Sequence, residues 1–362
     1  MHKKSLAAAV LAVLVPTLAP AAWAQSSVTV YGVLDAGLSL ESGNKAGSIT
    51  KVTGGISSGS RIGFKGTEDL GGGNSALFVL ESGVQADTGA SGQGGVLFGR
   101  QAFVGIGNRG LGTLTVGRQY APHYLTAVFA DPFTSGTSAD EKNLINAVSN
   151  GGRMDNSLKY ASPAWNGFSG ELAYAAGEVA GNATAGRSAG LALAYAAGPL
   201  AVRLAFHDKS NDTATVSLAS ARNTLLAATY AFKAAKLYAA FGVNKGPLSS
   251  TLRNATNPYG YAVAPLATTV TRDSTDALVG VSVPFGPHVL MASWIHKNDK
   301  EAADQDADQF GLGYRYYLSR RTDVYAIYAR MLNRNGASYT LGNASDGGSG
   351  NRAVNLGMRH TF

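Results

Sequence analysis

Apolar and polar residues alternate along most of this chain with a period of two. In the segment 28–38 the even positions are apolar or glycine, whereas the odd positions include Thr29, Tyr31 and Asp35. The same alternation recurs in three further segments, 61–67, 309–318 and 354–362. Because successive side chains of a β-strand point to opposite faces, this period predicts strands rather than helices.

The alternation predicts sixteen antiparallel strands, joined in turn by tight turns and by long polar segments. Every tight turn contains Gly, Pro, Ser, Asn or a charged residue, as turn geometry requires. An even strand count with alternating short and long connections is typical of an up-and-down membrane barrel. The expected strands are 27–39, 59–68, 75–84, 99–107, 112–120, 156–162, 167–176, 188–196, 199–208, 223–232, 236–245, 274–283, 287–298, 308–317, 321–331 and 352–362.

The two faces of these strands decide between a soluble β-sandwich and a membrane barrel. Charged residues occupy one face, and apolar or aromatic residues form a band on the other. This division suits lipid outside and water inside. Beyond residue 25 no apolar run reaches the about 20 residues that a membrane-spanning helix needs. The predicted fold class is therefore all-β, a sixteen-stranded antiparallel transmembrane β-barrel.

The N-terminal segment follows a different pattern. A short basic start precedes an apolar run, and Ala22-Trp23-Ala24 offers the small-x-small site that signal peptidase accepts. We expect residues 1–24 to be a cleaved signal peptide and residues 25–362 to be the barrel domain. A membrane anchor is the alternative, which two prolines and the short apolar run disfavour. Cleavage removes two lysines and lowers the formal charge from +7 to +5.

Composition and motifs argue against an enzyme. The chain contains no cysteine, which excludes zinc–cysteine sites, iron–sulfur clusters, disulfides and cysteine nucleophiles. The G-x-G-x-x-G segment 105–110 and the G-x-S-x-G segment 55–59 lack the following helix that their chemistries require. The acidic segment 304–308 resembles a calcium loop, but Gln309 and Arg315 stand where Gly and Glu are needed. A solvated acidic loop is the favoured interpretation, and a divalent ion held against lipopolysaccharide is the alternative.

Several segments resemble the signature strands of Gram-negative trimeric porins, especially those of β-proteobacteria. The resemblance is carried by the opening strand 27–37, the second strand and turn 59–73, and the segments 98–105 and 115–120. Phe362, with apolar or aromatic residues at alternate positions before it, is similar to the assembly signal of outer-membrane barrels. The resemblance implies a sixteen-stranded homotrimer in the outer membrane, with the long third loop folded into each pore.

The same resemblance sets the expected partners. They are two further copies of the chain, the lipid and lipopolysaccharide of the outer membrane, and small hydrophilic solutes and ions. We expect no cofactor, no metal and no nucleic acid.

Strand parity, with apolar residues outward, places charges of both signs in the lumen. The basic residues are Arg61, Lys65, Arg100, Lys159, Arg203, Arg315 and Arg359, and the acidic residues are Asp35, Glu81, Glu171, Asp276 and Asp323. This is only a modest basic excess. Either these side chains tune the permeating ions, or they pair with one another along the wall and tune nothing.

The third long connection, about 121–155, is expected to form the constriction, since long loops in compact folds are usually functional. In the porins that this chain resembles, loop acids face a ladder of arginines on the wall. The expected wall arginines are Arg61, Arg100 and Arg153, and the expected loop acids, unranked, are Asp131, Asp140 and Glu141. Arg118 breaks the parity rule and is expected at the loop root or against another subunit.

We therefore expect passive diffusion of ions and small hydrophilic solutes, with a mild preference for anions. A channel specific for one acid or sugar is an alternative. A structural or adhesive barrel, with loops that bind host or phage proteins, is another. A barrel enzyme is disfavoured because the sequence offers no credible catalytic triad.

Overall fold

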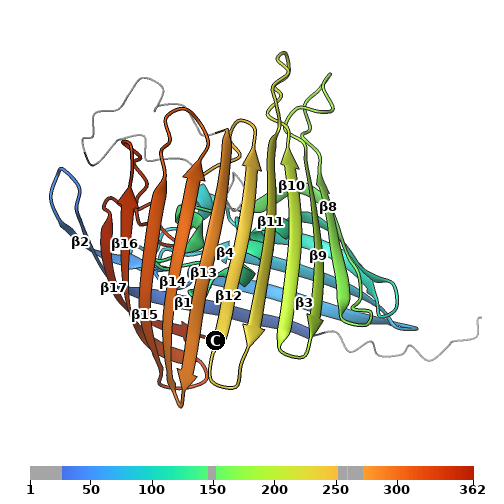
Figure 1. The fold of residues 1–362 in the computed structure, drawn as a ribbon. Helices are drawn as coiled ribbons and strands as arrows, with labels where there is room; N and C mark the ends of the chain where they lie inside the picture. The colour runs from blue at the N-terminus through green and yellow to red at the C-terminus, as the bar shows by residue number, and fades with distance from the viewer. Residues whose placement is uncertain (1–26, 146–151, 252–258, 260–271) are drawn as a thin grey trace, which may run out of the picture.

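The computed structural model shows one closed antiparallel β-sheet (Figure 1). It describes residues 27–145, 152–251, 259 and 272–362, so the predicted signal peptide, residues 1–24, lies outside the described residues. None of the helices in these ranges is long and apolar enough to cross a membrane. The elements are β1 (Ser27–Ser42), β2 (Ile49–Gly54), β3 (Arg61–Gly71), β4 (Asn74–Gly83), η1 (Gln93–Gly95), β5 (Gln101–Asn108), β6 (Gly112–Tyr120), α1 (Pro122–Ala130), η2 (Glu141–Asn143), β7 (Arg153–Ala161), β8 (Phe168–Ala175), β9 (Ser188–Ala197), β10 (Leu200–Lys209), β11 (Ala221–Ala231), β12 (Lys236–Lys245), β13 (Asp273–Phe285), β14 (His288–Asp299), β15 (Ala307–Tyr317), β16 (Thr322–Asn333) and β17 (Arg352–Thr361).

The sheet closes because its first strand pairs with its last. One edge of β1 pairs with β17, from Val33 opposite Thr361 to Ser42 opposite Arg352. The other edge pairs with β3 along the N-terminal part of β1 and with β2 along its C-terminal part. Since β2 and β3 share one place in the ring, the barrel has sixteen strand positions. Closure gives each of the sixteen long strands a partner on both edges, as a membrane requires.

The sixteen predicted strands are confirmed, and their ends agree with the structure within three residues. The short strand β2 was not predicted, because Ile49 and Val52 fall out of period two. It forms for a reason that lies elsewhere in the chain. β1 continues past the start of β3, and β2 pairs with residues 36–41 that would otherwise form an open edge.

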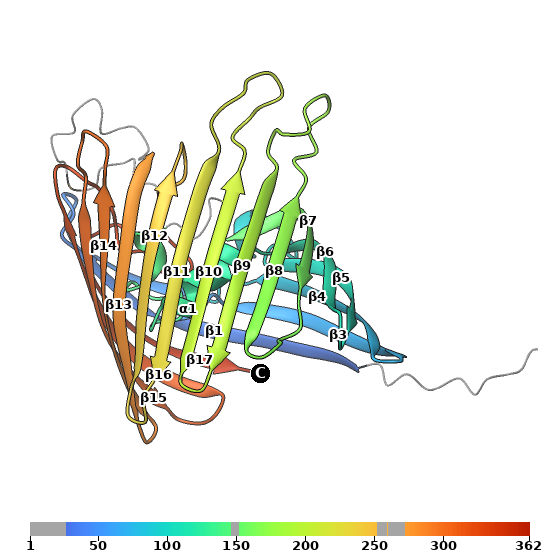
Figure 2. The same ribbon diagram turned by 45° about the vertical axis from the view of Figure 1, so that its right-hand side comes forward.

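Tight turns gather at one end of the barrel and long connections at the other (Figures 1 and 2). Two-residue turns join β9 to β10 and β13 to β14. In the first of these, Gly198 has φ 55°, the left-handed conformation that such hairpins use. The predicted alternation of short and long connections is therefore confirmed.

The barrel wall is apolar outside and polar or small inside. On β15, Phe310 and Leu312 are exposed on the outer surface, whereas the alternate residues Gly311 and Arg315 are buried on the inner face. Exposed apolar side chains recur in this way on strands all around the ring. The outer surface is thus built to contact lipid.

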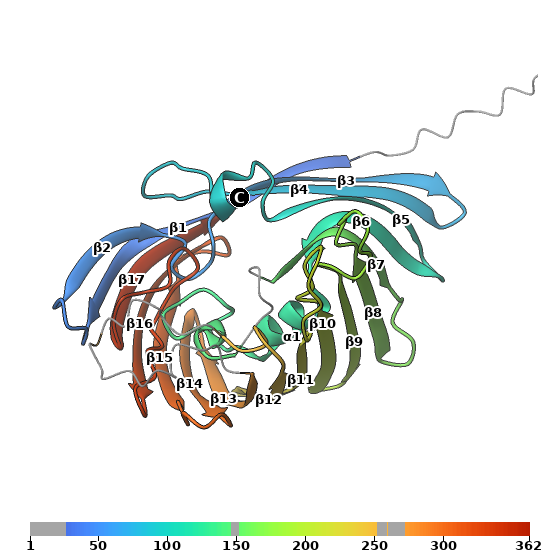
Figure 3. The same cartoon turned by 90° about the horizontal axis from the view of Figure 1, so that it is seen from above.

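The third long connection folds into the barrel, as predicted. Seen from above, α1 lies inside the ring of strands, where it packs against β9–β12 (Figure 3). Beyond α1, Phe133 is fully buried against β15, where Gly311 and Gly313 leave room for its ring. A Cβ at Gly313 would lie 2.7 Å from the Phe133 ring, and a Cβ at Gly280 would lie 2.8 Å from Pro132. Inward glycines on the wall therefore form the seat of this loop.

Phe362 adds to the closure of the barrel. Its carbonyl oxygen accepts a hydrogen bond from the Gly32 amide (3.0 Å), and its own amide donates to the Gly32 carbonyl (3.1 Å). The phenyl ring covers Gly32, which has no side chain to block it. The role of Phe362 as an assembly signal stays a prediction.

Replacing Phe133 by Ala should release the third loop, because losing a buried phenyl ring costs about 3–5 kcal/mol. Trypsin should then cut after Lys142 about 100-fold faster, since about 1.4 kcal/mol is a factor of ten in an equilibrium. The control Phe310→Ala, on the lipid face, should leave the cleavage rate unchanged. Equal cleavage of wild type and Phe133→Ala would mean that this ring does not hold the loop.

Candidate functional site

The third loop and the facing wall enclose a space of about 1290 Å³, here called the lumen cavity. The loop contributes Tyr124, Leu125, Val128, Thr134, Ser135 and Lys142 to its lining. The last long connection contributes residues 343–347. The charged lining residues are Arg61, Arg100, Arg118, Lys142, Arg153, Lys209, Asp155 and Asp346. Because the third loop folds into the barrel (Figure 3) and lines this cavity together with the facing wall, the cavity is the candidate constriction.

The three expected wall arginines lie at or next to the first residues of three strands, and all three line this cavity. Arg61 is the first residue of β3, Arg153 is the first residue of β7, and Arg100 immediately precedes β5. Each of these strands begins at the loop end of the barrel, so the three side chains lie at similar depth. The Nη2 of Arg61 donates a hydrogen bond to the Ser58 hydroxyl at 2.7 Å.

Tyr120 orients two of these arginines. Its hydroxyl accepts hydrogen bonds from the Nη2 of Arg100 (2.7 Å) and from the Nη2 of Arg153 (3.2 Å). The Arg153 guanidinium lies 4.9 Å from the centre of the Tyr120 ring, a cation–π contact. Arg100 also donates from Nε to Glu81 at 2.6 Å. These contacts fix the direction of both guanidinium groups.

Arg118 reaches the cavity through an irregularity in β6. The register between β6 and β7 shifts between Gly117 and Gln119, and Gly117 has φ 134°. Such a bulge redirects the side chain that follows it. Arg118 therefore lies near the root of the loop, where Nη1 contacts Asp155 and Nε donates to the Gly99 carbonyl at 2.7 Å. Its departure from parity was the signal for this placement.

Lys142 and Lys209 also line the cavity and were missed from the sequence. Lys209 continues the inward parity that had selected Arg203 on the same strand. Lys142 carried no such signal, because the loop has no strand period. Both acidic lining residues are engaged by cations: Asp155 contacts Arg118, and Asp346 lies 3.0 Å from the Nζ of Lys51.

The three expected loop acids lie inside the third loop and do not line the cavity. Asp131, Asp140 and Glu141 are 1%, 0% and 0% exposed. The Asp131 carboxylate accepts hydrogen bonds from the backbone amides of Phe133 (2.9 Å) and Ser135 (2.8 Å). Glu141 accepts one from the Ser135 hydroxyl at 2.9 Å. These local bonds turn the carboxylates back onto their own loop and correct the expectation that they face the arginines.

The pKa values of these buried carboxyl groups shift in different directions. Burial, reinforced by the charge of Asp140, raises the pKa of Asp131 to about 6 and raises the pKa of Glu141 well above its usual value. Burial opposes ionisation of Asp140 as well. There the ammonium of Lys142, 2.8 Å away, and the hydrogen bonds to the carboxylate outweigh burial and lower the pKa. Asp140 is therefore the acid of this group that most favours the charged form.

The charges that parity placed on the wall are largely paired with one another. The pairs are Glu81–Arg100 (2.6 Å), Glu171–Lys159 (2.8 Å), Glu171–Arg203 (2.8 Å), Asp276–Lys297 (2.8 Å), Asp323–Arg315 (3.3 Å) and Asp323–Arg359 (2.7 Å). Lys65 lies 5.2 Å from the centre of the Tyr31 ring. Pairing along the wall, one of the two sequence interpretations, is confirmed for these residues.

Asp35 has a structural role. Its carboxylate accepts hydrogen bonds from the backbone amides of Ile56 (3.0 Å), Ser57 (3.2 Å) and Ser58 (3.1 Å), and from the Tyr325 hydroxyl (2.6 Å). The side chain is completely buried. Asp35 therefore holds the segment before β3 against the wall and offers no charge to the lumen.

Lys297 ties the third loop to the wall opposite the arginines. Its ammonium is completely buried and donates to Asp276 (2.8 Å), Ser274 (3.3 Å) and the carbonyl of Leu144 in the loop (3.1 Å). Sequence reasoning selected Asp276 but missed this partner. The loop is thus bound to one side of the lumen, which leaves the arginine side facing the cavity.

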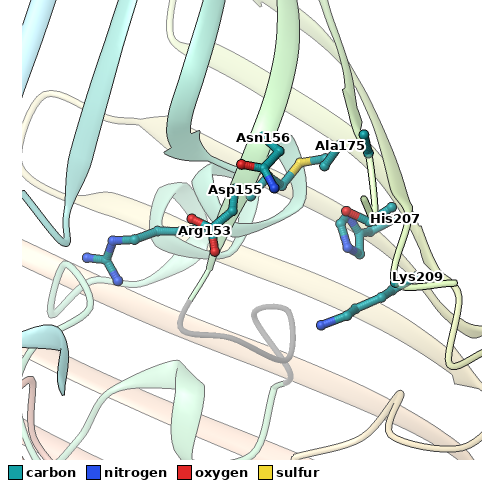
Figure 4. A pocket seen from close by; sticks show the side chains of 11 residues that line it. Arg153, Asp155, Asn156, Ala175, His207 and Lys209 are labelled. Atoms are coloured by element: carbon teal, nitrogen blue, oxygen red, sulfur yellow. The ribbon is translucent and has the colours of Figure 1, made fainter. Parts of the chain in front are cut away.

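A side pocket of about 170 Å³ adjoins the lumen cavity (Figure 4). Arg153, Asp155 and Lys209 line both spaces. His207 also lines the pocket, is 1% exposed, and has no hydrogen-bond partner at either ring nitrogen within the described part of the chain. The pocket therefore extends the basic lining toward β10.

The closed barrel, its apolar outer face and its inward-folded loop define an outer-membrane channel. The Gram-negative porin family matches residues 7–336. An outer membrane porin protein of Bordetella pertussis is 33% identical across the whole of both chains, and outer membrane porin protein 32 of Delftia acidovorans is 31% identical, also across both. This chain belongs to the Gram-negative porin family and is an outer-membrane protein.

Solved structures agree with this assignment. The anion-selective porin from Comamonas acidovorans superimposes with a TM-score of 0.76 at 26% identity, covering 93% of this chain and all of that one. OmpF of Salmonella typhi superimposes with a TM-score of 0.68 at 15% identity, covering 92% of this chain and 97% of that one. The second likeness concerns the fold alone.

Replacing Lys297 by Met should destabilise the folded barrel by about 3–5 kcal/mol, because it leaves the buried Asp276 carboxylate without its cation. The double variant Lys297→Met with Asp276→Leu removes both charges and should recover most of that loss. Thermal unfolding followed by circular dichroism measures both effects. A single variant as stable as wild type, or a double variant no better than the single, would contradict this assignment.

Proposed function

We propose that this porin conducts small hydrophilic solutes and ions by passive diffusion and prefers anions. The observation that carries the proposal is the charge of the lumen cavity. Six basic side chains line it against two acidic ones; Arg100, Arg118 and Lys142 form ion pairs with Glu81, Asp155 and Asp140, and counting Asp346 and these three carboxylates still leaves a basic excess of 6 − 4 = +2. The solved porin of Comamonas acidovorans is described as anion-selective, so its preference has the same sign as the one proposed here.

The physical basis is the local field at the narrowest water-filled part of the channel. Fixed charges of one sign in a cleft with low-dielectric walls raise the concentration of counter-ions and exclude co-ions. Paired wall charges contribute little to this field, because opposite charges about 3 Å apart largely cancel at a distance. The basic excess of the cavity lining therefore decides the selectivity.

The rival functions make different demands on the structure. A channel specific for one solute would show conductance that its ligand blocks saturably. A purely structural or adhesive barrel needs no water-filled space beside the third loop, whereas the lumen cavity is about 1290 Å³. The motifs that could suggest an enzyme are not followed by a helix: residues 105–110, for example, form the end of β5 and the start of its tight turn to β6.

We further propose a homotrimer embedded in outer-membrane lipid and lipopolysaccharide, delivered by a signal peptide cleaved after residue 24. OmpT of Vibrio cholerae, which shares the fold at 16% identity with a TM-score of 0.64, has been solved in a trimer form. In this chain, Val96 and Leu97 lie in the loop between β4 and β5 and are 52% and 70% exposed. Adjacent exposed apolar side chains at the loop end of a barrel indicate a contact surface for another copy.

Replacing Arg61, Arg100 and Arg153 together by Gln should shift the reversal potential of the channel toward potassium. Single channels in a planar bilayer under a KCl gradient measure this shift. The matched control replaces Arg109, Arg320 and Arg321, which are exposed in the short turns, and so removes the same net charge outside the lumen. The control should keep the wild-type preference for chloride.

Two outcomes of this experiment would sink parts of the proposal. An unchanged reversal potential in the lumen variant would show that these arginines do not set selectivity. A wild-type preference for potassium would overturn the anion assignment while leaving the channel. Because Arg100 pairs with Glu81, a variant that also carries Glu81→Gln checks that an unpaired acid is not the cause of any shift.

Replacing Leu97 by Asp should weaken the trimer, because it introduces a charge into the expected contact between copies. Analytical ultracentrifugation in detergent measures the change in oligomeric mass. Leu111→Asp is the control, since Leu111 is 73% exposed in a short turn at the opposite end of the barrel. Trimers that survive Leu97→Asp, or a wild-type protein that sediments as a monomer, would contradict this interface.

A further inference from the structure

We propose that Asp131, Asp140 and Glu141 hold a divalent cation of the calcium type inside the third loop. The three residues join the two ends of the segment that crosses the lumen. Asp131 directly follows α1, and Asp140 and Glu141 form the start of η2. A cation between them would therefore brace this segment from within. The inference does not depend on the ion preference of the channel.

The geometry of the three carboxyl groups supports a common ligand. One carboxylate oxygen from each residue lies within 4.8 Å of the other two. Among the described residues, no other group of three His, Cys, Asp or Glu side chains is arranged in this way. Calcium accepts carboxylate oxygens in flexible, irregular arrangements at 2.3–2.6 Å, a geometry that a loop can supply.

A second observation points to a missing partner. The Oε2 atom of Glu141 is buried and accepts no hydrogen bond, although Oε1 accepts one from the Ser135 hydroxyl. The Oδ2 atom of Asp140, by contrast, has the ammonium of Lys142 as its partner at 2.8 Å. A buried polar atom without a partner is costly. A cation between the three carboxyl groups would provide a partner for the Oε2 atom of Glu141.

The net charge of the cluster determines the sign and the magnitude of the charge that the expected ligand carries. Binding a metal requires all three carboxyl groups in the charged form, and with the ammonium of Lys142 they then carry a net charge of −3 + 1 = −2 in a part of the loop that is almost fully buried. Uncompensated charge in such a place costs several kcal/mol. One divalent cation brings the sum to zero. Oxygen-only ligands favour calcium or magnesium over softer metals, and the flexible loop favours calcium.

The acidic segment 304–308, of which Asp304 is exposed, provides a contrast within the same chain. Asp304 and Asp306 lie in the loop before β15, where Asp306 accepts a hydrogen bond from the Asp299 amide and Asp304 accepts one from Asn335. The carboxylates of this segment are engaged by neighbouring donors and form no cluster of the kind described above. They therefore serve as the matched control.

The test uses the full-length folded protein, prepared in detergent free of lipopolysaccharide so that no lipid phosphate binds the metal. After treatment with EGTA, calcium chloride is titrated by isothermal calorimetry, with magnesium chloride in parallel. We expect one calcium per chain, at least about tenfold weaker binding in Glu141→Gln, and unchanged binding in Asp304→Asn. Tryptic cleavage after Lys142 should slow when calcium is added to wild type but not to Glu141→Gln.

The results with these variants distinguish calcium binding at the loop cluster from calcium binding at the acidic segment around Asp304. The absence of calcium binding to wild type would overturn the proposal, as would binding that Asp304→Asn abolishes and Glu141→Gln leaves intact. Asp131→Asn provides a second variant should Glu141→Gln fail to fold, and heat modifiability on gels identifies folded barrels. Reversal potentials measured on the same preparations show whether the channel keeps its ion preference, so failure here does not bear on the proposed function.

Discussion

Everything in this structure follows from the lack of hydrogen-bond partners in a lipid bilayer. Backbone amides and carbonyls in hydrocarbon must find partners within the protein, and a sheet achieves this only by closing on itself. The pairing of β1 with β17 provides that closure. It is extended at one end by the paired backbones of Gly32 and Phe362 and protected at the other by β2. Once the sheet is closed, its outer face contacts lipid and must be apolar, and its lumen contains either protein side chains or water.

The lumen is filled on one side only. Inward glycines on β13 and β15 make space for Pro132 and Phe133, and Lys297 bonds the loop backbone to the same wall. The loop therefore leans away from the strands that carry Arg61 and Arg153. Water and solute are left with the basic half of the cross-section. Because the loop packs on one side of the lumen, the water-filled side is lined mainly by basic residues.

The sequence was informative wherever the fold imposes a period. Every strand contacts lipid on one face and the lumen on the other, so alternation located the strands and, through parity, placed Arg61 and Arg100 on the inner wall. Parity did not place Arg118 on either face, because a bulge at Gly117 resets the parity, and the sequence therefore left two positions open: the loop root, where the residue lies, and a contact with another subunit. The third loop has no period at all. Whether Asp131 faces water or its own backbone depends on the positions of the amides two and four residues later, which only the folded loop determines.

The cost of holding like charges together explains why the selectivity is built on the wall. Two unit charges 4 Å apart repel by about 4 kcal/mol at an effective dielectric constant of 20, and the folded barrel must offset such repulsion around its cavity. Glu81 offsets part of it for Arg100, and Tyr120 supports two guanidinium groups through its hydroxyl and its ring. A passing anion relieves the remaining repulsion without any rearrangement, because the cations are already oriented. The ends of the strands, fixed by the closure of the barrel, hold that arrangement in place.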